Sequence, residues 1–252
     1  MKKKKIIIAV TAVVAITAVA APAISFGRIK NVDYTLPEGF TVTAHTGCEG
    51  EKDNTLESIR AGINAGAEIV EIDLHYLSDK TPVLSHDKPE TDAVSEAVPS
   101  LESAFELLKD ADVKMNVDVK STENIAAVLP LAEKHGVKEK IFFTGVEEKD
   151  VEAVKQGAEG IAYFLNVSVD KSKKNNSEYI SSLVEKVKST GAIGINLKYT
   201  GCSKALVEAF RKENLLVSVW TANSKSVMYR CLSLEPDNIT TRHPSVLREI
   251  MS

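Results

Sequence analysis

Cysteine is scarce in this sequence, and basic charge is not in excess. Cys48, Cys202 and Cys231 are the three cysteines in 252 residues, so outside the cell they permit one disulfide and one free thiol. Cys48 and Cys202 are expected on the same face of the fold, where a bridge between them and three reduced thiols are the two alternatives. The 31 basic residues are outnumbered by 35 acidic ones. Because nucleic-acid binding requires a basic surface, this balance argues against a nucleic-acid partner.

The first 27 residues form a segment of their own, with the pattern of an export signal. Lys2–Lys5 precede an apolar run from Ile6 to Phe26. Cleavage after the small-x-small sequence Ala18–Ala20 would release a secreted protein. The run also has the roughly 20 residues that span a bilayer, so it could instead remain as a membrane anchor. Both alternatives predict an extracellular domain. Without the four lysines, 27 basic residues face 35 acidic ones, a net charge of −8.

After a linker at 28–39, residues 40–252 are long enough for one domain and alternate between strand-like and helix-like segments. The eight expected strands are 41–45, 69–75, 82–85, 114–119, 140–144, 160–165, 193–197 and 216–220. Helices are expected near 55–65, 100–109, 123–135, 147–156, 177–189, 203–213 and 224–232. This α/β alternation predicts a single-domain TIM (β/α)8 barrel. A doubly wound open sheet is the alternative, but no glycine-rich dinucleotide fingerprint follows any strand.

Acidic side chains stand at the expected ends of two strands. Glu71 and Asp73 share one strand face because side chains alternate with period two, and Asp118 ends the fourth expected strand. Acids that face one barrel mouth repel each other unless a cation joins them. Three oxygen ligands favour Mg²⁺ or Ca²⁺. The alternative for an acidic pair alone is a hydrogen-bonded structural pair.

Two histidines end strand-like segments beside these acids. His45 ends the first and His86 follows the third. Imidazole can hold or release a proton near neutral pH, so the pair suits acid–base cleavage beside a divalent metal. Asp87 either orients an imidazole or caps the next turn, and His75 is expected to play a supporting part.

Taken in order, these segments resemble the glycerophosphodiester phosphodiesterase family over roughly residues 40–247. The segments are AHTG (44–47), DNTLES (53–58), EIDLHY (71–76), PVLSHD (82–87) and SVWTAN (218–223). The resemblance implies a metal-dependent phosphoric diester hydrolase that cleaves a small-molecule glycerophosphodiester to glycerol 3-phosphate and an alcohol, in lipid metabolism. His45 would be the base and His86 the acid.

The resemblance also assigns two further residues. Lys120 matches the lysine of the family's Glu-x-Lys motif and would neutralise phosphate charge as a catalytic and substrate-binding residue. Trp220 would pack against the glycerol moiety or fill the barrel mouth.

Several positions depart from the family pattern. Thr46 stands at the phosphate-binding arginine of the family's His-Arg-Gly motif, and threonine cannot supply a guanidinium's bidentate charge. Asp118 and Asp53 replace glutamates. The sequence DNITTRHP (237–244) stands where the family usually has Asp-x-Ile-Ile-Thr-Asp-x-Pro. Thr46 is therefore assigned to the substrate site with the substrate identity left open, and Lys198 is one candidate for the missing charge.

Two other functions remain open at this stage. A phospholipase D or sphingomyelinase-like enzyme acting on intact lipid would favour apolar loops at the barrel mouth, whereas the loops here are polar. A non-catalytic phosphate-ligand binding protein would follow from the loss of the arginine, but the histidine pair argues against it. Membrane association is expected only through the N-terminal segment.

Overall fold

The computed structural model describes residues 33–252, which form one compact unit. The signal peptide or anchor predicted at 1–27, and with it the predicted membrane association, lies outside the described residues. Within the described part, no helix is long and apolar enough to cross a membrane.

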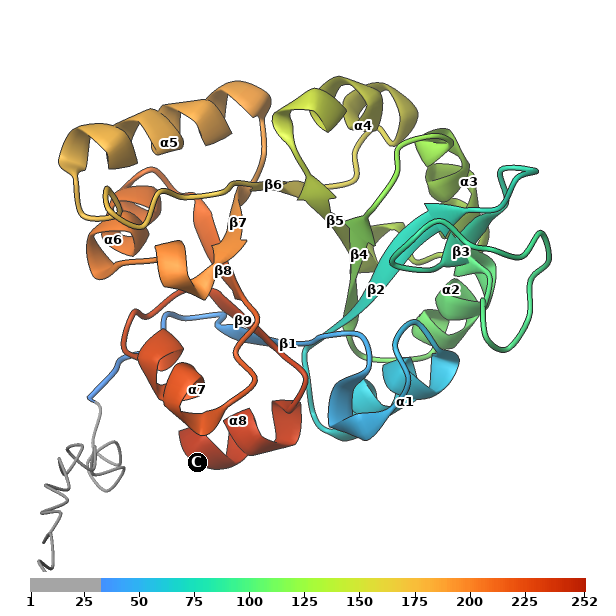
Figure 1. Cartoon of the computed structure of the whole chain (residues 1–252), viewed down its shortest axis with the longest axis horizontal. Helices are drawn as coiled ribbons and strands as arrows, with labels where there is room; N and C mark the ends of the chain where they lie inside the picture. Colours follow the sequence, from blue (N-terminus) through green and yellow to red (C-terminus); the bar gives the residue numbers. More distant parts are fainter. Residues whose placement is uncertain (1–32) are drawn as a thin grey trace, which may run out of the picture. The chain divides into compact units, whose positions relative to one another are not determined.

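Eight parallel strands close into a barrel with helices around the outside, as the sequence predicted (Figure 1). The ring order is β1-β2-β4-β5-β6-β7-β8-β9, and β9 pairs with β1 to close it. The ring strands are β1 Thr41–Ala44, β2 Ile69–Tyr76, β4 Lys114–Val119, β5 Ile141–Val146, β6 Tyr163–Asn166, β7 Gly194–Lys198, β8 Leu216–Trp220 and β9 Asn238–Thr241. All carboxyl ends of these strands therefore meet at one mouth of the barrel, which is where barrel enzymes place their active sites.

Helices cover the outer faces of the strands. They are α1 Leu56–Asn64, α2 Leu101–Lys109, α3 Val128–Lys134, α4 Val151–Gly157, α5 Ser177–Thr190, α6 Lys204–Lys212, α7 Lys225–Leu232 and α8 Pro244–Met251. Thr55 caps α1 by accepting a hydrogen bond from the Ser58 amide, which satisfies one free donor of the first turn. Alternation along β2 turns Val70, Ile72 and Leu74 outward, where all three are buried. The acidic residues between them consequently point into the barrel.

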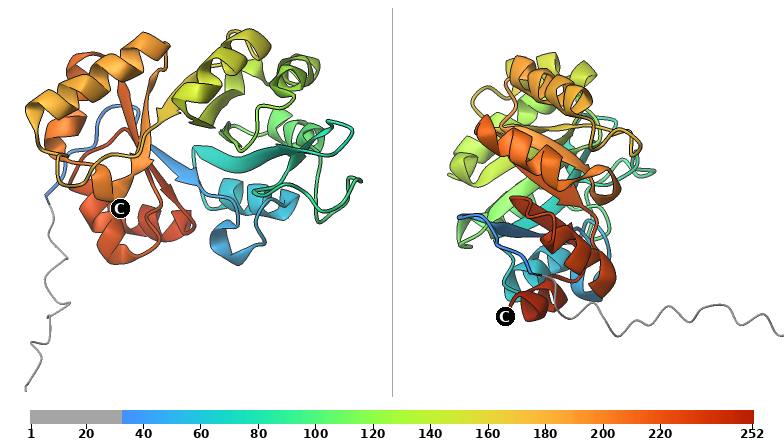
Figure 2. Two further views of the ribbon diagram at one scale, coloured as in Figure 1. Left: turned by 45° about the horizontal axis from the view of Figure 1, so that its top comes forward. Right: turned by 90° about the vertical axis from the view of Figure 1, so that its left-hand side faces the viewer.

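One predicted barrel strand is wrong, and one barrel strand was missed. Residues 82–85 were expected as the third ring strand, but β3 (Pro82–Leu84) pairs antiparallel with β2 as a hairpin outside the ring. The connection from Tyr76 to Pro82 is too short for a crossover, which explains why no helix was found there. The segment between β3 and α2 then projects from the side of the barrel (Figure 2).

The missed ring strand is β9, and the helix after it, α8, was also not predicted. Only Ile239 of β9 is apolar, because Asn238, Thr240 and Thr241 make up the rest of the strand. All four are buried all the same. Asn238 donates hydrogen bonds to the Thr41 and Thr43 hydroxyls of β1, so polar contacts close the ring where an apolar run was expected.

The three cysteines are free thiols, and each is buried. The Cys48 thiol donates to the Ser58 carbonyl, so the alternative of a Cys48–Cys202 bridge is not realised. Burial raises the pKa of Cys202 and of Cys231 to about 12, which keeps both protonated and unreactive at neutral pH.

Candidate active site

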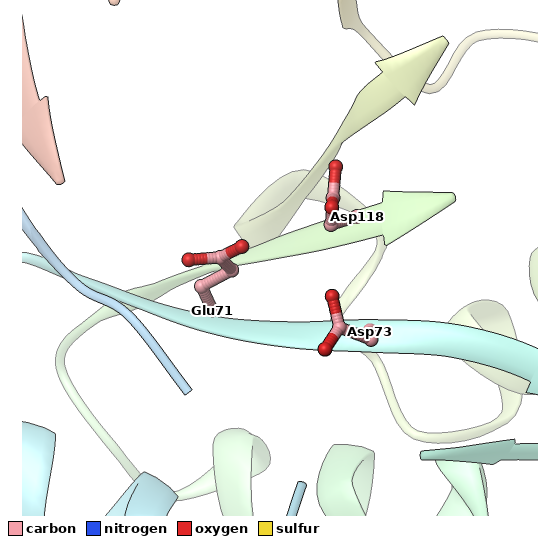
Figure 3. A group of neighbouring side chains, drawn as sticks. All are labelled: Glu71, Asp73 and Asp118. Atoms are coloured by element: carbon pink, nitrogen blue, oxygen red, sulfur yellow. The ribbon is translucent and has the colours of Figure 1, made fainter. Parts of the chain in front are cut away.

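Three carboxylates converge at the mouth of the barrel (Figure 3). Glu71 and Asp73 come from β2, and Asp118 lies opposite Asp73 in the register of β4. All three are buried, and one oxygen of each lies within 4.8 Å of the other two. The predicted metal ligands are therefore brought together by strand alternation and parallel register alone.

Neighbouring side chains fix two of these carboxylates. The Asn54 side-chain amide donates to Asp73 Oδ2 at 2.8 Å, and the Asp73 backbone amide donates to Asn54 Oδ1 at 2.9 Å. The Thr144 hydroxyl donates to Asp118 Oδ1 at 2.7 Å. Such surrounding bonds orient ligand oxygens before a cation binds.

The environment of the Glu71 carboxylate fits a bound cation. Its Oε2 atom is buried and has no hydrogen-bond partner among the described residues. Burial, followed by the charges of Asp118 and Asp73, raises the pKa of Glu71 well above its usual range. A bound Mg²⁺ or Ca²⁺ would supply the missing partner and remove the repulsion, so the donor set fits a hard divalent cation.

Lys120 lies against two of the three acids. Its Nζ is 3.1 Å from Asp73 Oδ1 and also forms an ion pair with Asp118. Burial alone would lower the pKa of Lys120, but the charges of Asp118 and Asp73 outweigh it and raise the pKa. The ammonium group is therefore a fixed positive charge beside the carboxylates.

His45 follows β1 and lines the same cavity, whose volume is about 510 Å³. Its Nδ1 is 2.8 Å from the Thr46 carbonyl oxygen, an acceptor, so Nδ1 carries the hydrogen. In the neutral ring Nε2 is then a free proton acceptor. Burial lowers the pKa of His45, so the neutral form dominates at pH 7. These are the properties of a general base.

The pH dependence of catalysis should reflect this environment. Activity that needs neutral His45 falls as the pH drops through the pKa of the folded enzyme. Burial lowers that pKa more than the Thr46 carbonyl and the charges of Asp73 and Asp53 raise it, and the Arg242 charge lowers it further. We therefore expect the acid limb of kcat/KM at a pH below 6.5. A pH–rate profile with an acid limb above 6.5 would contradict the assignment of His45 as base.

His86 lies at the rim of the cavity, on the segment that follows β3. Its Nδ1 is 2.9 Å from Asp87 Oδ1, so the aspartate orients the imidazole, one of the two predicted alternatives for Asp87. The His86 side chain is 66% exposed. An exposed imidazole at the rim can exchange protons with solvent, as an acid for a leaving group requires.

Of the two remaining predicted substrate-binding residues, Trp220 lines the cavity and Thr46 does not. Trp220 lines the cavity, and its Nε1 is buried without a hydrogen-bond partner among the described residues. Thr46 is buried and does not line the cavity, because its Oγ1 accepts from the Asn54 backbone amide at 2.6 Å. Thr46 therefore contacts the loop that holds Asp73 and not the open space.

Sequence reasoning missed Arg242, which directly follows β9 and lines the cavity. Its Nη1 and Nη2 donate to the two oxygens of Asp53 at 2.5 and 2.8 Å. These hydrogen bonds hold the pKa of Asp53 below its usual value. The signal that could have revealed it is the arginine at the acidic position of the Asp-x-Ile-Ile-Thr-Asp-x-Pro pattern.

Lys198 and the three other histidines do not line this cavity. Lys198 is exposed and is not among the residues that line the cavity, so it does not supply the missing charge. His75 contacts the backbone of Tyr76. His135 pairs with two glutamates of α2, and His243 occupies the N-cap position of α8 without a side-chain cap hydrogen bond.

Gly145 leaves no room for a side chain next to Asp118. A Cβ atom there would lie 2.4 Å from the Val119 carbonyl oxygen and 2.7 Å from Asp118 Oδ1, and its φ is +74°. We expect Gly145→Ala to destabilise the fold by roughly 2–4 kcal/mol and to weaken metal binding. Gly136→Ala is the matched control, since its φ is +67° with no atom within 4 Å. Equal costs in denaturant unfolding would contradict the steric argument.

Comparison with known proteins agrees with this geometry. Residues 43–124 and 90–246 match the glycerophosphoryl diester phosphodiesterase family. A glycerophosphodiester phosphodiesterase of Caldanaerobacter subterraneus is 24% identical over 248 residues, covering 82% of this chain and 95% of that protein.

Solved structures share the fold. A phosphodiesterase of Oleispira antarctica, solved with the product sn-glycerol-3-phosphate, superposes with a TM-score of 0.71 at 19% identity, over 86% of this chain and 97% of that one. A glycerophosphodiester phosphodiesterase of Thermotoga maritima gives 0.60 at 23% identity, over 83% and 97%.

The fold and the site define an α/β barrel with a candidate divalent-cation site at its mouth. Because the matched segments span more than half of the sequence, the chain belongs to the glycerophosphoryl diester phosphodiesterase family. The resemblance noted from the sequence motifs is confirmed.

Proposed function

We propose that the protein hydrolyses glycerophosphodiesters to glycerol 3-phosphate and an alcohol, as part of lipid metabolism, with Mg²⁺ or Ca²⁺ held by Glu71, Asp73 and Asp118. The observation that carries the proposal is the unpartnered Glu71 Oε2 in a cluster of three buried carboxylates that faces the same cavity as His45. A divalent cation bound there would polarise the phosphoryl oxygens and stabilise the charge that develops on them.

The chain's own groups supply the proton transfers. His45 Nε2 removes the proton from the glycerol hydroxyl next to the phosphate, whose oxygen forms a new bond to phosphorus. The bond from phosphorus to the leaving alcohol breaks, and His86 donates the proton that this alcohol needs. Water then opens the cyclic phosphate by the reverse transfers, which gives glycerol 3-phosphate.

Binding groups complete the site. The Lys120 ammonium faces the growing negative charge on the phosphoryl oxygens. Trp220 offers its ring to the glycerol moiety. Thr46 acts on the substrate through Asn54, which it holds against Asp73.

A substrate panel tests this function. We expect release of glycerol 3-phosphate from glycerophosphocholine, glycerophosphoethanolamine and glycerophosphoglycerol, and little or no turnover of sphingomyelin or lysophosphatidylcholine. The cavity is lined chiefly by charged and amide side chains, which suits a small polar diester and offers an acyl chain little apolar surface. Faster turnover of the intact lipids would favour the phospholipase alternative, and phosphate-ester binding with no turnover would favour a binding protein.

The proposed location of the enzyme, outside the cytoplasm, rests on its N-terminal sequence. The basic and then apolar order of Lys2–Lys5 and Ile6–Phe26 supports export, with the enzyme either secreted or held at the membrane by residues 6–26. N-terminal sequencing of the exported protein distinguishes the two, because cleavage after Ala20 leaves Ala21 as the first residue.

A further inference from the structure

We infer that Arg242, oriented by Asp53, binds the substrate phosphate in place of the arginine that this chain lacks at position 46. The inference rests on the proposed function and adds to it the guanidinium that receives the anionic substrate. Arg242 follows β9, whereas the arginine of the family motif would stand at position 46, after the neighbouring strand β1.

The backbone of Arg242 is held in place from two sides. Its amide donates to Asn223 Oδ1 at 2.9 Å, and its carbonyl accepts from the Glu49 amide at 2.9 Å. The side chain is held by the two parallel hydrogen bonds to Asp53. A guanidinium fixed at both ends loses little entropy when it binds a ligand.

Donors remain free on this fixed group. The bidentate pair uses one hydrogen on each Nη, and a guanidinium has five N–H hydrogens. Within residues 33–252 the Arg242 side chain has no other hydrogen-bond acceptor, and it is 33% exposed. Nε–H and the outer Nη hydrogens are thus available to phosphate oxygens, the anion whose geometry a guanidinium matches.

Arg242 is also close to the reacting groups. His45 directly follows β1, and its amide donates to the Thr241 carbonyl at 2.9 Å, so the two residues end neighbouring strands at one level. The hydrogen bonds to Asp53, and after them the charges of Asp53, Glu71 and Asp73, raise the pKa of Arg242, so its guanidinium lies within electrostatic reach of the carboxylate cluster. A phosphate held between the carboxylate-bound cation and Arg242 would therefore lie beside the proposed base.

Charge balance requires a second cation in the cavity. Among the described residues that line it, four carboxylates face two fixed cations, Lys120 and Arg242. A divalent metal brings this set to formal neutrality. Without Arg242 the cavity would keep a net negative charge in front of an anionic phosphodiester, which opposes binding.

Gly47 gives the ion pair its space. A Cβ at residue 47 would lie 1.8 Å from Asp53 Oδ1 and 2.5 Å from Arg242 Nη1, and the φ of Gly47 is +70°. The Asp53–Arg242 pair therefore packs directly on the loop after β1. Together with threonine at 46 and arginine at 242, in place of the family pattern's arginine and aspartate, this contact indicates that the positive charge has moved from one strand end to the next.

Arg242→Met tests the inference, with Arg248→Met as the matched control. Arg248 is also 33% exposed and ion-paired, to Glu68, but it does not line the cavity. We expect Arg242→Met to raise the KM for glycerophosphocholine and the inhibition constant of glycerol 3-phosphate by about 10- to 100-fold, the effect of losing charge-assisted hydrogen bonds. The metal concentration for half-maximal activity should not rise, because Glu71, Asp73 and Asp118 all remain in this variant. Arg242→Lys, which keeps the charge without the fork, should recover part of the loss, and Arg248→Met should behave as wild type.

Calorimetric titration of inorganic phosphate into the Mg²⁺- or Ca²⁺-loaded proteins provides a readout that needs no turnover. Weaker phosphate binding to Arg242→Met alone supports the inference even if wild type hydrolyses no glycerophosphodiester, an outcome that would sink the proposed function. Equal phosphate affinity and equal inhibition constants in the two methionine variants, both with wild-type unfolding transitions, would overturn the role of Arg242. Folding failure of Arg242→Met leaves Arg242→Lys as the deciding variant, and a wild-type KM there would likewise overturn the inference.

Discussion

Excess EDTA is expected to abolish hydrolysis of glycerophosphocholine, and added Mg²⁺ or Ca²⁺ to restore it. Glu71, Asp73 and Asp118 bring three negative charges within 4.8 Å of one another, and the neighbouring Lys120 neutralises one. A divalent cation supplies the balance and partners the buried Glu71 Oε2. The measurement is the rate of glycerol 3-phosphate release before chelation, after it, and after each metal is added back.

Two aspartate variants tie the metal to this cluster. Asp73→Asn should raise the metal concentration for half-maximal activity by at least roughly 10-fold, since even the partners of metal ligands contribute that much. Asp110→Asn removes an exposed carboxylate at the end of α2 and should leave this metal concentration unchanged. Full activity in excess EDTA would remove the cation from the account, and an unchanged metal requirement in Asp73→Asn would place it elsewhere.

His45→Ala and His86→Ala should each lower kcat by roughly 10²–10⁴-fold, the usual contribution of a positioned proton-transfer group. His45 has the buried position and free Nε2 of a base, whereas His86 is an exposed imidazole oriented by Asp87. The double variant should lose much less than the product of the two effects, because the two transfers belong to one reaction.

His135→Ala is the control for this pair, since that histidine contacts glutamates and does not line the cavity. Its kcat should match that of wild type. Near-normal turnover in either cavity variant would make that histidine structural, and a loss in His135→Ala as large as theirs would point to general destabilisation.

Local pattern was enough to predict the barrel and the acidic cluster. Glu71 and Asp73 alternate with buried apolar residues along one strand, and parallel register carries Asp118 to the same level. Both facts follow from strand geometry, which short sequence windows contain. The antiparallel hairpin of β3 and the polar strand β9 were not predictable in this way, because pairing partners far along the chain decide them.

The Arg242–Asp53 pair shows the same limit within the site. Its partners are separated by 189 positions in the sequence, so no local spacing connects them. The side-chain direction of Thr46 was equally hidden, because the Asn54 amide that binds it belongs to a loop whose path is set by tertiary packing. Residue types at strand ends could thus be predicted as a group, while their individual contacts required the fold.

Phosphorus NMR of glycerophosphocholine incubated with the purified protein and Mg²⁺ or Ca²⁺ tests the central claim most directly. The expected result is that the glycerophosphocholine resonance is replaced by one of glycerol 3-phosphate, and that this change is lost in the Asp73→Asn variant at low metal concentration. Appearance of phosphocholine in its place, or an unchanged spectrum with every divalent cation supplied, would contradict the proposal that this site cleaves the bond between phosphorus and the alcohol.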